Sequence, residues 1–266
     1  MKKHHYLIRL GSWRLLKHCF GEQSSLESLK LLHYALELGI EHIDTAGFYA
    51  HHQIEEFLGK NISKQLFEFS TKVGLIWVKK NVKVANLNLK SQLIASLKRL
   101  KRSHVETVLL HVPTNTFEAC CEQLVSICKE GLAKNWGVCN CNYQQAKLAS
   151  ELGASEWHLE HNLLHKGFDI HLQKLPLNYV AFSPFAQGYL LNKQVDWAKN
   201  DWRLSSYMAF KRAYYTSQLS LLNRQLGTTQ IVSWFDTQKQ LDTVIIGPRD
   251  INQLKVWFDE TTIQPK

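Results

Sequence analysis

The sequence predicts a (β/α)₈ barrel that forms a single domain over residues 1–266 and is short at both termini. Three observations support this fold class. β-rich segments alternate with amphipathic helical ones, no linker rich in proline, glycine or serine divides them, and the length of 266 residues is close to that of one such barrel, about 250 residues. A doubly wound sheet is the competing fold, but none of the 13 glycines forms the GxG pattern that seats a pyrophosphate there.

In the first half of the chain, strand-like segments alternate with helix-like ones. Residues 6–10 form the first predicted strand, and Ser24 with Glu27 forms a capping box that begins a helix ended by Gly39. Apolar periodicity then predicts the elements that follow. These are the end of a strand at residues 40–43, a short helix up to residue 59, a strand over 67–72, a helix over 89–100 and a strand over 105–110.

The alternation continues in the second half. Helices over 117–130 and 143–152 are each followed by a glycine, which is typical of a helix C-terminus. The further predicted elements are strands over 135–139, 157–159 and 179–182, helices around 207–226 and 230–238, a last strand over 244–246 and a closing helix over 251–258. Because about eight strands are each followed by a helical pattern, we expect them to lie parallel and to close into a barrel.

The net charge of +9 raises the question of a nucleic-acid partner. The basic residues are spread over helical segments, however, and the densest run, residues 98–102, interleaves with Leu97 and Leu100 at helical spacing. That pattern is typical of a solvated helix end. We therefore expect no nucleic-acid partner, and the charge favours an anionic cofactor or substrate.

The chain has no sequence feature that directs it to a membrane or out of the cell. Only a short apolar run precedes Arg9, and nowhere do about 18 apolar residues follow one another. We expect a cytoplasmic protein with no membrane partner, either a monomer or a weak homo-oligomer. The six cysteines form no CxxC pair and are expected to be thiols, and no ligand pattern accompanies His51 and His52, so we expect no metal.

Three polar residues stand at predicted strand ends, and a tyrosine follows one of them. Asp44, Lys72 and His111 end successive strands, and Tyr49 lies on the loop after Asp44. Taken singly, each has an ordinary structural explanation, such as a turn cap, a solvated strand end or a packed ring. In a barrel, however, all strand C-termini point to the face on which active sites lie. Their coincidence at one rim predicts a catalytic site.

These four residue types can move a proton together. A tyrosine with the usual pKa of about 10 is a poor proton donor at pH 7, but a lysine cation lowers that pKa and a carboxylate fixes the lysine. Tyr49 could then give a proton to a carbonyl oxygen, with Lys72 and Asp44 behind it. His111 would orient that oxygen by a hydrogen bond.

The sequence resembles the aldo-keto reductases over nearly its whole length. The spacing from Tyr49 to Glu55 and Gly59 is similar to that of the branch that includes the D-threo-aldose dehydrogenases. The matching motifs are Gly11-Ser12-Trp13, Asp44-Thr45-Ala46, Ser70-Thr71-Lys72-Val73-Gly74, Ser96-Leu97-Lys98-Arg99-Leu100, Leu109-Leu110-His111, Gly137-Val138-Cys139-Asn140, Ala181-Phe182-Ser183-Pro184-Phe185 with Gly188, and Val244-Ile245-Ile246-Gly247 with Gln253-Leu254.

The resemblance implies an oxidoreductase that interconverts carbonyls and alcohols with NADP(H), NAD(H) remaining an alternative. Asp44, Tyr49, Lys72 and His111 would be its catalytic residues. Phe182 would stack on the nicotinamide and Asn140 would hold its carboxamide, while residues of the last βα segment would lie along the phosphates and adenosine. The implied cofactor-binding set is Gly11, Ser12, Asp44, Asn140, His158, Phe182, Ser183, Gly247, Arg249 and Gln253.

Several positions depart from the family pattern. Cys139 stands where the family usually has serine, His158 where it has a glutamine that helps hold the carboxamide, and Ala50 where glycine follows the tyrosine. Arg249 either pairs with a 2′-phosphate, whose geometry suits a guanidinium, or is an exposed arginine without a ligand. An N-terminal hairpin and a long C-terminal substrate loop are both expected to be absent.

The pocket should therefore be open. Its substrate side is expected to carry Trp13, Phe48 and Trp77, although each is equally explained as ordinary packing. The substrate would be an aldehyde, a ketone or a sugar. A module that binds NADPH to regulate a partner, with little turnover, remains the alternative, since the departures concern the cofactor positions.

Overall fold

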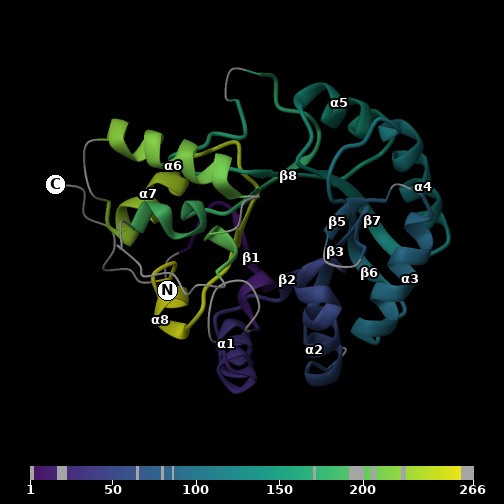
Figure 1. The fold of residues 1–266 in the computed structure, drawn as a ribbon, viewed down its shortest axis with the longest axis horizontal. Helices are drawn as coiled ribbons and strands as arrows, with labels where there is room; N and C mark the ends of the chain where they lie inside the picture. Colours follow the sequence, from purple (N-terminus) through teal and green to yellow (C-terminus); the bar gives the residue numbers. More distant parts are fainter. Residues whose placement is uncertain are drawn as a thin grey trace.

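The computed structural model describes residues 3–16, 23–63, 66–78, 81–85, 87–169, 172–191, 201–204, 208–222 and 226–258. Its centre is a closed barrel of parallel strands in the order β1-β10-β9-β8-β7-β6-β3-β2, which confirms the predicted fold class (Figure 1). The barrel strands are β1 (Leu7–Gly11), β2 (His42–Asp44), β3 (Glu68–Val73), β6 (Val105–Leu110), β7 (Ala133–Cys139), β8 (Glu156–Glu160), β9 (Asn178–Phe182) and β10 (Thr243–Ile246).

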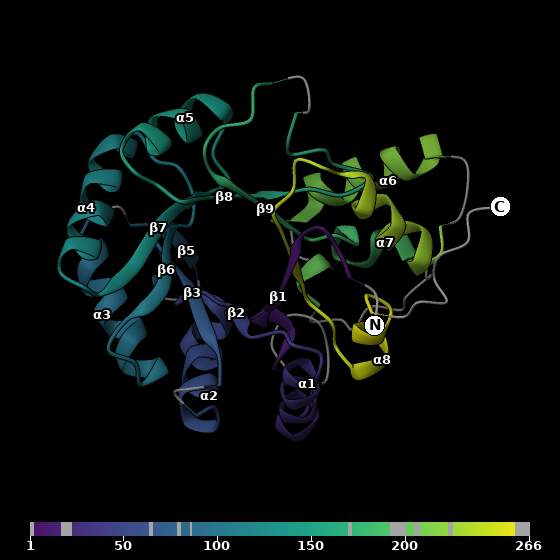
Figure 2. The same cartoon turned by 180° about the vertical axis from the view of Figure 1, so that it is seen from behind.

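Helices surround this barrel. In both views α3, α4 and α5 cover one side, and α6, α7 and α8 cover the other (Figures 1 and 2). Their bounds are α1 (Ser25–Glu37), α2 (Gln53–Asn61), α3 (Leu89–Leu100), α4 (Phe117–Lys129), α5 (Tyr143–Glu151), α6 (Ala209–Leu222), α7 (Thr228–Thr237) and α8 (Ile251–Lys255).

Local sequence signals explain several helix boundaries. The Ser24 hydroxyl accepts from the backbone of Glu27 while the Glu27 carboxylate accepts from the backbone of Ser24, so the predicted capping box is present at the start of α1. α3 has the predicted bounds, and its leucines at positions 89, 93, 97 and 100 all face the core. α8 ends earlier than expected, at Lys255.

The expectation that every strand is followed by a helix fails at one place. Between β8 and β9, the described residues 161–169 and 172–177 form no helix, and two helices, α6 and α7, lie between β9 and β10 instead. The ring of helices is therefore interrupted beside β8, where an extended connection crosses (Figure 2). That connection packs aromatic side chains against the barrel, with the rings of Phe168 and Tyr179 stacked at 4.8 Å.

An antiparallel hairpin was missed by the sequence reasoning. Strands β4 (Leu75–Val78) and β5 (Asn81–Val84) follow β3 after Gly74, whose φ of 97° favours glycine. The segment lacks the Asn-Gly or Asp-Gly pair that usually marks a tight hairpin, so its pattern gave no strong signal. The hairpin matters because it carries Trp77.

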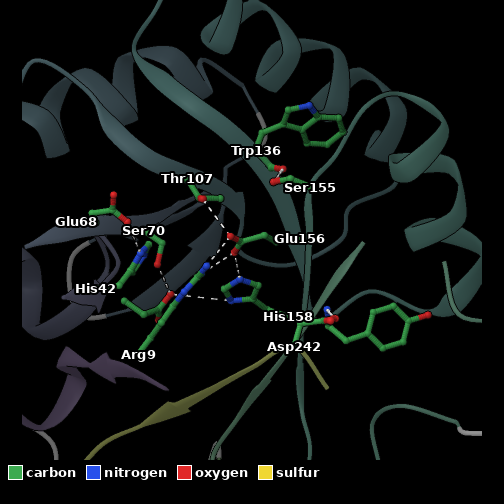
Figure 3. A network of polar contacts seen from close by, with 12 residues as sticks. Arg9, His42, Glu68, Ser70, Thr107, Trp136, Ser155, Glu156, His158 and Asp242 are labelled. Atoms are coloured by element: carbon green, nitrogen blue, oxygen red, sulfur yellow. Dashed lines mark hydrogen bonds and ion pairs between the residues drawn. The ribbon is translucent and has the colours of Figure 1, made fainter. Parts of the chain in front are cut away.

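The barrel interior is polar. Barrels of this kind are usually filled by layers of branched aliphatic side chains. Here Arg9 on β1 donates to Glu156 on β8, although β10 and β9 separate these strands, so the contact crosses the interior (Figure 3).

Among the described residues, no helix is long and apolar enough to cross a membrane.

Candidate active site

The predicted catalytic residues lie together at the C-terminal ends of neighbouring strands. Asp44 ends β2, Lys72 lies near the end of β3, and His111 directly follows β6. The order β6-β3-β2 makes these strands neighbours. Tyr49 begins the short 3₁₀ helix η2 (Tyr49–His52), which returns the chain over the strand ends.

Lys72 is the centre of the contacts between them. Its ammonium donates to the Asp44 carboxylate, to the Thr45 carbonyl oxygen at 3.0 Å and to the Tyr49 hydroxyl at 3.3 Å. The Ser70 hydroxyl donates to the other Asp44 oxygen at 2.8 Å. An ammonium has donors only, so the Tyr49 oxygen accepts this hydrogen bond and the phenolic proton is directed elsewhere.

Burial dominates the proton equilibria of these residues. It raises the pKa of the Tyr49 phenol to about 12, although Lys72 acts to lower that pKa, as the sequence reasoning expected. Burial alone would also raise the pKa of Asp44, but the Lys72 ammonium brings it below its usual value, and burial would lower the pKa of Lys72 while Asp44 raises it overall. At pH 7 the site therefore holds a neutral tyrosine beside an ion pair.

His111 lies beside this group as a neutral imidazole. Its ring centroid is 6.1 Å from that of Tyr49 in an edge-on arrangement, and burial, assisted by Lys72, lowers its pKa to about 3. Its Nδ1 is buried and has no hydrogen-bond partner among the described residues. A neutral imidazole in this place can hydrogen-bond a substrate oxygen next to the Tyr49 hydroxyl.

The buried histidines predict a loss of stability on mild acidification. Burial lowers the pKa values of His42 and His161 to about 4 and that of His111 to about 3. The unfolded chain, with histidine pKa values near 6.5, therefore takes up protons first as the pH falls. As the pH falls from 6.5 to 5, each of these histidines should lower the free energy of unfolding by about 1 to 2 kcal/mol.

Urea unfolding at pH 8 and pH 5 measures this effect. A His161→Gln variant, which cannot take up a proton at this position, should show a smaller difference between the two pH values. Equal unfolding free energies at both pH values in the parent chain would contradict the prediction.

The aromatic residues expected at the substrate side gather around Tyr49. The Trp13 ring stacks on the Tyr49 ring at 5.5 Å, and the rings of Phe48 and Trp77 stack at 5.0 Å. The Trp77 indole nitrogen donates to the Phe48 carbonyl oxygen at 2.8 Å, which ties the β4–β5 hairpin to the loop before Tyr49. His51 adds a ring at 3.8 Å from Trp77, a contact that the sequence did not suggest.

The backbone after Tyr49 has an unusual conformation. Ala50, His51 and His52 all have positive φ values, of 48°, 51° and 76°. Positive φ values are unfavourable for residues that have a Cβ atom, which explains why glycine suits the position after the tyrosine. The His52 ring hydrogen-bonds the Gly47 carbonyl oxygen and supports this turn.

Among the described residues, no group of three or more His, Cys, Asp or Glu side chains is arranged to hold a metal ion.

Most of the predicted cofactor residues lie on the same rim as the tetrad, the group of four predicted catalytic residues Asp44, Tyr49, Lys72 and His111. Gly11 ends β1 and Ser12 begins the short 3₁₀ helix η1 (Ser12–Arg14). Phe182 ends β9 and Ser183 follows it, and Gly247 follows β10. The Ser12 hydroxyl is buried without a hydrogen-bond partner among the described residues. A Cβ added at Gly247 would be no closer than 3.8 Å to other atoms, so this turn has room for a side chain and is not forced to be glycine by contact.

Asn140 follows β7 in a left-handed conformation, with φ of 59°. Its side-chain nitrogen donates to the His111 carbonyl oxygen at 2.9 Å and to the Cys139 sulfur at 3.2 Å. Burial raises the pKa of the Cys139 thiol to about 12, so it remains protonated and can replace the hydroxyl of the usual serine. Asn140 is thereby fixed beside the tetrad, where an amide can meet the amide of a nicotinamide.

His158 does not lie on the surface of the site. Its side chain is 0% exposed, and its Nδ1 lies 4.0 Å from an Asp44 oxygen. Its Nε2 lies 2.7 Å from a Glu156 oxygen (Figure 3). In this conformation the His158 side chain is not exposed at the site. This burial disfavours the role of holding the carboxamide that the resemblance implies for His158.

Two charged residues of the interior were missed by the sequence reasoning. Arg9 lies within an apolar strand, and Glu156 precedes His158 by two positions, which puts both on one face of β8. A charge inside a strand buried on both faces is a signal in itself, because such groups are rarely buried without a partner.

Comparison with known proteins identifies relatives. The sequence model described as "Aldo/keto reductase family" matches residues 7–260. L-glyceraldehyde 3-phosphate reductase of Escherichia coli (strain K12) is 26% identical, covering 93% of this chain and 82% of the relative. The uncharacterized oxidoreductase YqkF of Bacillus subtilis (strain 168) is 22% identical, covering 86% and 80% respectively.

Solved structures have the same fold. The glycerol dehydrogenase AKR11B4 from Gluconobacter oxydans superposes with a TM-score of 0.74 at 21% identity, over 95% of this chain and 86% of that one. The aldo-keto reductase AKR11C1 from Bacillus halodurans, in its holo form, gives a TM-score of 0.75 at 19% identity, over 97% and 87%.

Proposed function

Because this chain belongs to the aldo/keto reductase family, we propose that it is an NADP-linked oxidoreductase that interconverts a carbonyl compound and an alcohol, with Tyr49 as the general acid and base. The observation that carries this proposal is the position of Lys72. Its ammonium contacts both the Asp44 carboxylate and the Tyr49 hydroxyl at the mouth of a barrel. Asp44, Tyr49, Lys72 and His111 are the proposed catalytic residues.

Each catalytic residue has its own role in this reaction. When bound, the reduced nicotinamide supplies a hydride to the carbonyl carbon. Tyr49 gives its phenolic proton to the carbonyl oxygen, and the Lys72 ammonium stabilises the phenolate that remains. Asp44 keeps Lys72 charged and in place, and neutral His111 orients the carbonyl oxygen. In the reverse direction Tyr49 removes the alcohol proton.

The substrate side supports a small, partly apolar carbonyl compound. Trp13, Phe48 and Trp77 form an aromatic border around Tyr49. Relatives are described as reductases of L-glyceraldehyde 3-phosphate and of methylglyoxal. We therefore include short aldehydes and phosphorylated aldehydes in the proposed substrate range, together with sugars. The aldose dehydrogenase branch, the single-domain organisation and the oligomeric state stay predictions.

A turnover assay beside a binding titration tests the proposed function. A panel of aldehydes, ketones and sugars is offered with NADPH and with NADH, and with the oxidised cofactors for the alcohols. Nicotinamide fluorescence measures binding in parallel. We expect both binding and turnover. Binding without turnover on any substrate would contradict the proposal and favour the sensing alternative, which gains no support from the relatives named above.

Arg249 is the proposed contact to a 2′-phosphate. Its backbone is held on two sides, since Gln23 donates to its carbonyl oxygen and its amide donates to the Gln253 side chain, both at 2.9 Å. Burial lowers the pKa of nearby Arg14 to about 10, and the positive charges of Arg203 and Arg249 add to this. Arg203 is paired with Asp201, so Arg14 and Arg249 are the guanidinium groups that would favour a phosphate here.

Arg249→Ala should remove most of the preference for NADPH over NADH. One charge-assisted contact of about 1.5 to 3 kcal/mol corresponds to roughly tenfold to a hundredfold in dissociation constant. Titration of both cofactors at two salt concentrations measures it, and added salt should reduce the preference of the parent chain. Lys147→Ala, which removes an exposed charge on α5, is the matched control. Equal losses for both cofactors would place Arg249 on the shared pyrophosphate instead.

A further inference from the structure

Two ion pairs share the barrel interior. The upper pair is Lys72 with Asp44, at the strand ends. The lower pair is Arg9 with Glu156. Arg9 lies two positions before Gly11, the register partner of Asp44, so the lower pair is closer to the N-terminal end of the barrel.

The lower pair is built with good geometry. Two guanidinium nitrogens of Arg9 donate to the two Glu156 oxygens, each at 2.8 Å, and the Thr107 hydroxyl donates to one of these oxygens at 3.3 Å. Arg9 is 8% exposed and Glu156 is 4% exposed. Paired bonds between a guanidinium and a carboxylate are strong and fix orientation. The Arg9–Glu156 pair is therefore a well-oriented contact across the barrel, in which both carboxylate oxygens accept hydrogen bonds.

His158 lies between the two pairs, since it contacts Glu156 of the lower pair and faces Asp44 of the upper pair. Figure 3 shows its contact with Glu156. Its Nε2 is 2.7 Å from Glu156, and because a carboxylate can only accept, Nε2 carries the proton. Its Nδ1 faces Asp44 at 4.0 Å and has no hydrogen-bond partner among the described residues. Glu156 thus fixes the tautomer of His158, and the remaining lone pair points at the carboxylate that holds Lys72.

The charges of this interior balance only if His158 is neutral. Arg9 and Lys72 contribute two positive charges, and Asp44 and Glu156 two negative ones. Glu68 on β3 lies 3.5 Å from His42. Because the Glu68 side chain is 59% exposed, water screens its charge from the interior. A proton on His158 would leave an uncompensated positive charge in a buried place, which is costly.

We propose that Arg9 and Glu156 are positioning residues, which act through His158 to keep it uncharged and to hold the Asp44–Lys72 pair and Tyr49 in their working protonation states. This inference rests on the proposed function of Tyr49 and Lys72. It assigns a role in the chemistry to two residues that touch neither substrate nor cofactor. A positioning role shifts the pH profile in opposite directions when either partner is neutralised, whereas a purely structural role does not.

Neutralising each partner alone tests the proposal. Glu156→Gln leaves excess positive charge, which should lower the pKa values of Lys72 and Tyr49 and move the pH profile of turnover down by about one unit. Arg9→Met leaves excess negative charge, which should move the profile up by about the same amount. In Arg9→Met, His158 should take up a proton at pH 7 and so compensate this excess there. It should be neutral again at the alkaline limb of the profile, where Lys72 and Tyr49 titrate, so the excess negative charge remains at that limb. The double variant, balanced again, should return to the parent profile.

A measurement that needs no turnover separates this inference from the proposed function. NMR of the histidine ring nitrogens reports the charge of His158 without any turnover, so it tests the inference even if no substrate is found. His158 should be neutral in the parent chain and charged in Arg9→Met. Shifts of the profile in the same direction for both single variants, or a His158 that stays neutral in Arg9→Met, would overturn the proposal.

Conservative variants cover the case in which a single variant does not fold. Arg9→Lys keeps the charge, and the double variant Arg9→Met with Glu156→Gln keeps the balance. Both should hold the parent position of the pH profile and a neutral His158. A shift of about one unit in either variant would overturn the proposal.

Discussion

Tyr49→Phe is expected to lower kcat by about 10²- to 10⁴-fold while the affinity for the nucleotide stays nearly unchanged. The substitution removes only the hydroxyl that Lys72 contacts at 3.3 Å. It keeps the ring that stacks on Trp13 at 5.5 Å, so the packing of the site should survive. Steady-state kinetics and a fluorescence titration with the nucleotide separate the two effects.

A second tyrosine provides the control. Tyr143 on α5 donates from its hydroxyl to the Gln173 carbonyl oxygen, far along the chain from the tetrad and on the outer layer. Tyr143→Phe should leave kcat unchanged. A Tyr49→Phe variant with turnover within about twofold of the parent chain would exclude Tyr49 as the proton donor.

Lys72→Met is expected to affect both activity and stability. It removes the cation from an Asp44 side chain that is only 5% exposed, and breaking a buried pair on one side typically costs about 3 to 5 kcal/mol. Since Lys72 acts to lower the pKa of Tyr49, its loss should raise that pKa further and move or flatten the pH profile of the residual activity. The fold should survive, because total stabilities are usually about 5 to 15 kcal/mol.

The matched control removes both charges. Lys72→Met with Asp44→Asn leaves no buried carboxylate without a partner, so this double variant should be more stable than Lys72→Met alone in urea unfolding. Its activity should stay as low as that of Lys72→Met, because the cation that stabilises the phenolate is still missing. A Lys72→Met variant with the parent stability and pH profile would make Lys72 an ordinary strand end.

The sequence could predict which residues lie at the rim of the site, because the C-terminal ends of parallel strands lie on one face of the barrel. Once the alternation of strands and helices predicts a barrel, the residues that end its strands must share one face. Asp44, Lys72 and His111 follow from that rule alone. Tyr49 follows only in part, since its place over the strand ends depends on a turn in which Ala50 has a positive φ.

The interior of the barrel could not be predicted in the same way. Arg9 and Glu156 are 147 positions apart and meet only because the closed sheet brings β1 opposite β8. The burial of His158 has the same origin, since its position in a motif does not tell how deep in the barrel its side chain lies. Burial also outweighs Lys72 at Tyr49, and no local pattern reveals how much water a closed barrel removes.

Isotope transfer tests the central claim most directly. NADPH that carries deuterium at the transferable position of its nicotinamide ring is incubated with the protein and an aldehyde from the panel, and the alcohol is analysed by mass spectrometry and NMR. The account predicts one deuterium on the former carbonyl carbon, and very slow transfer in Tyr49→Phe. An alcohol without deuterium, or equal transfer in both proteins, would contradict it.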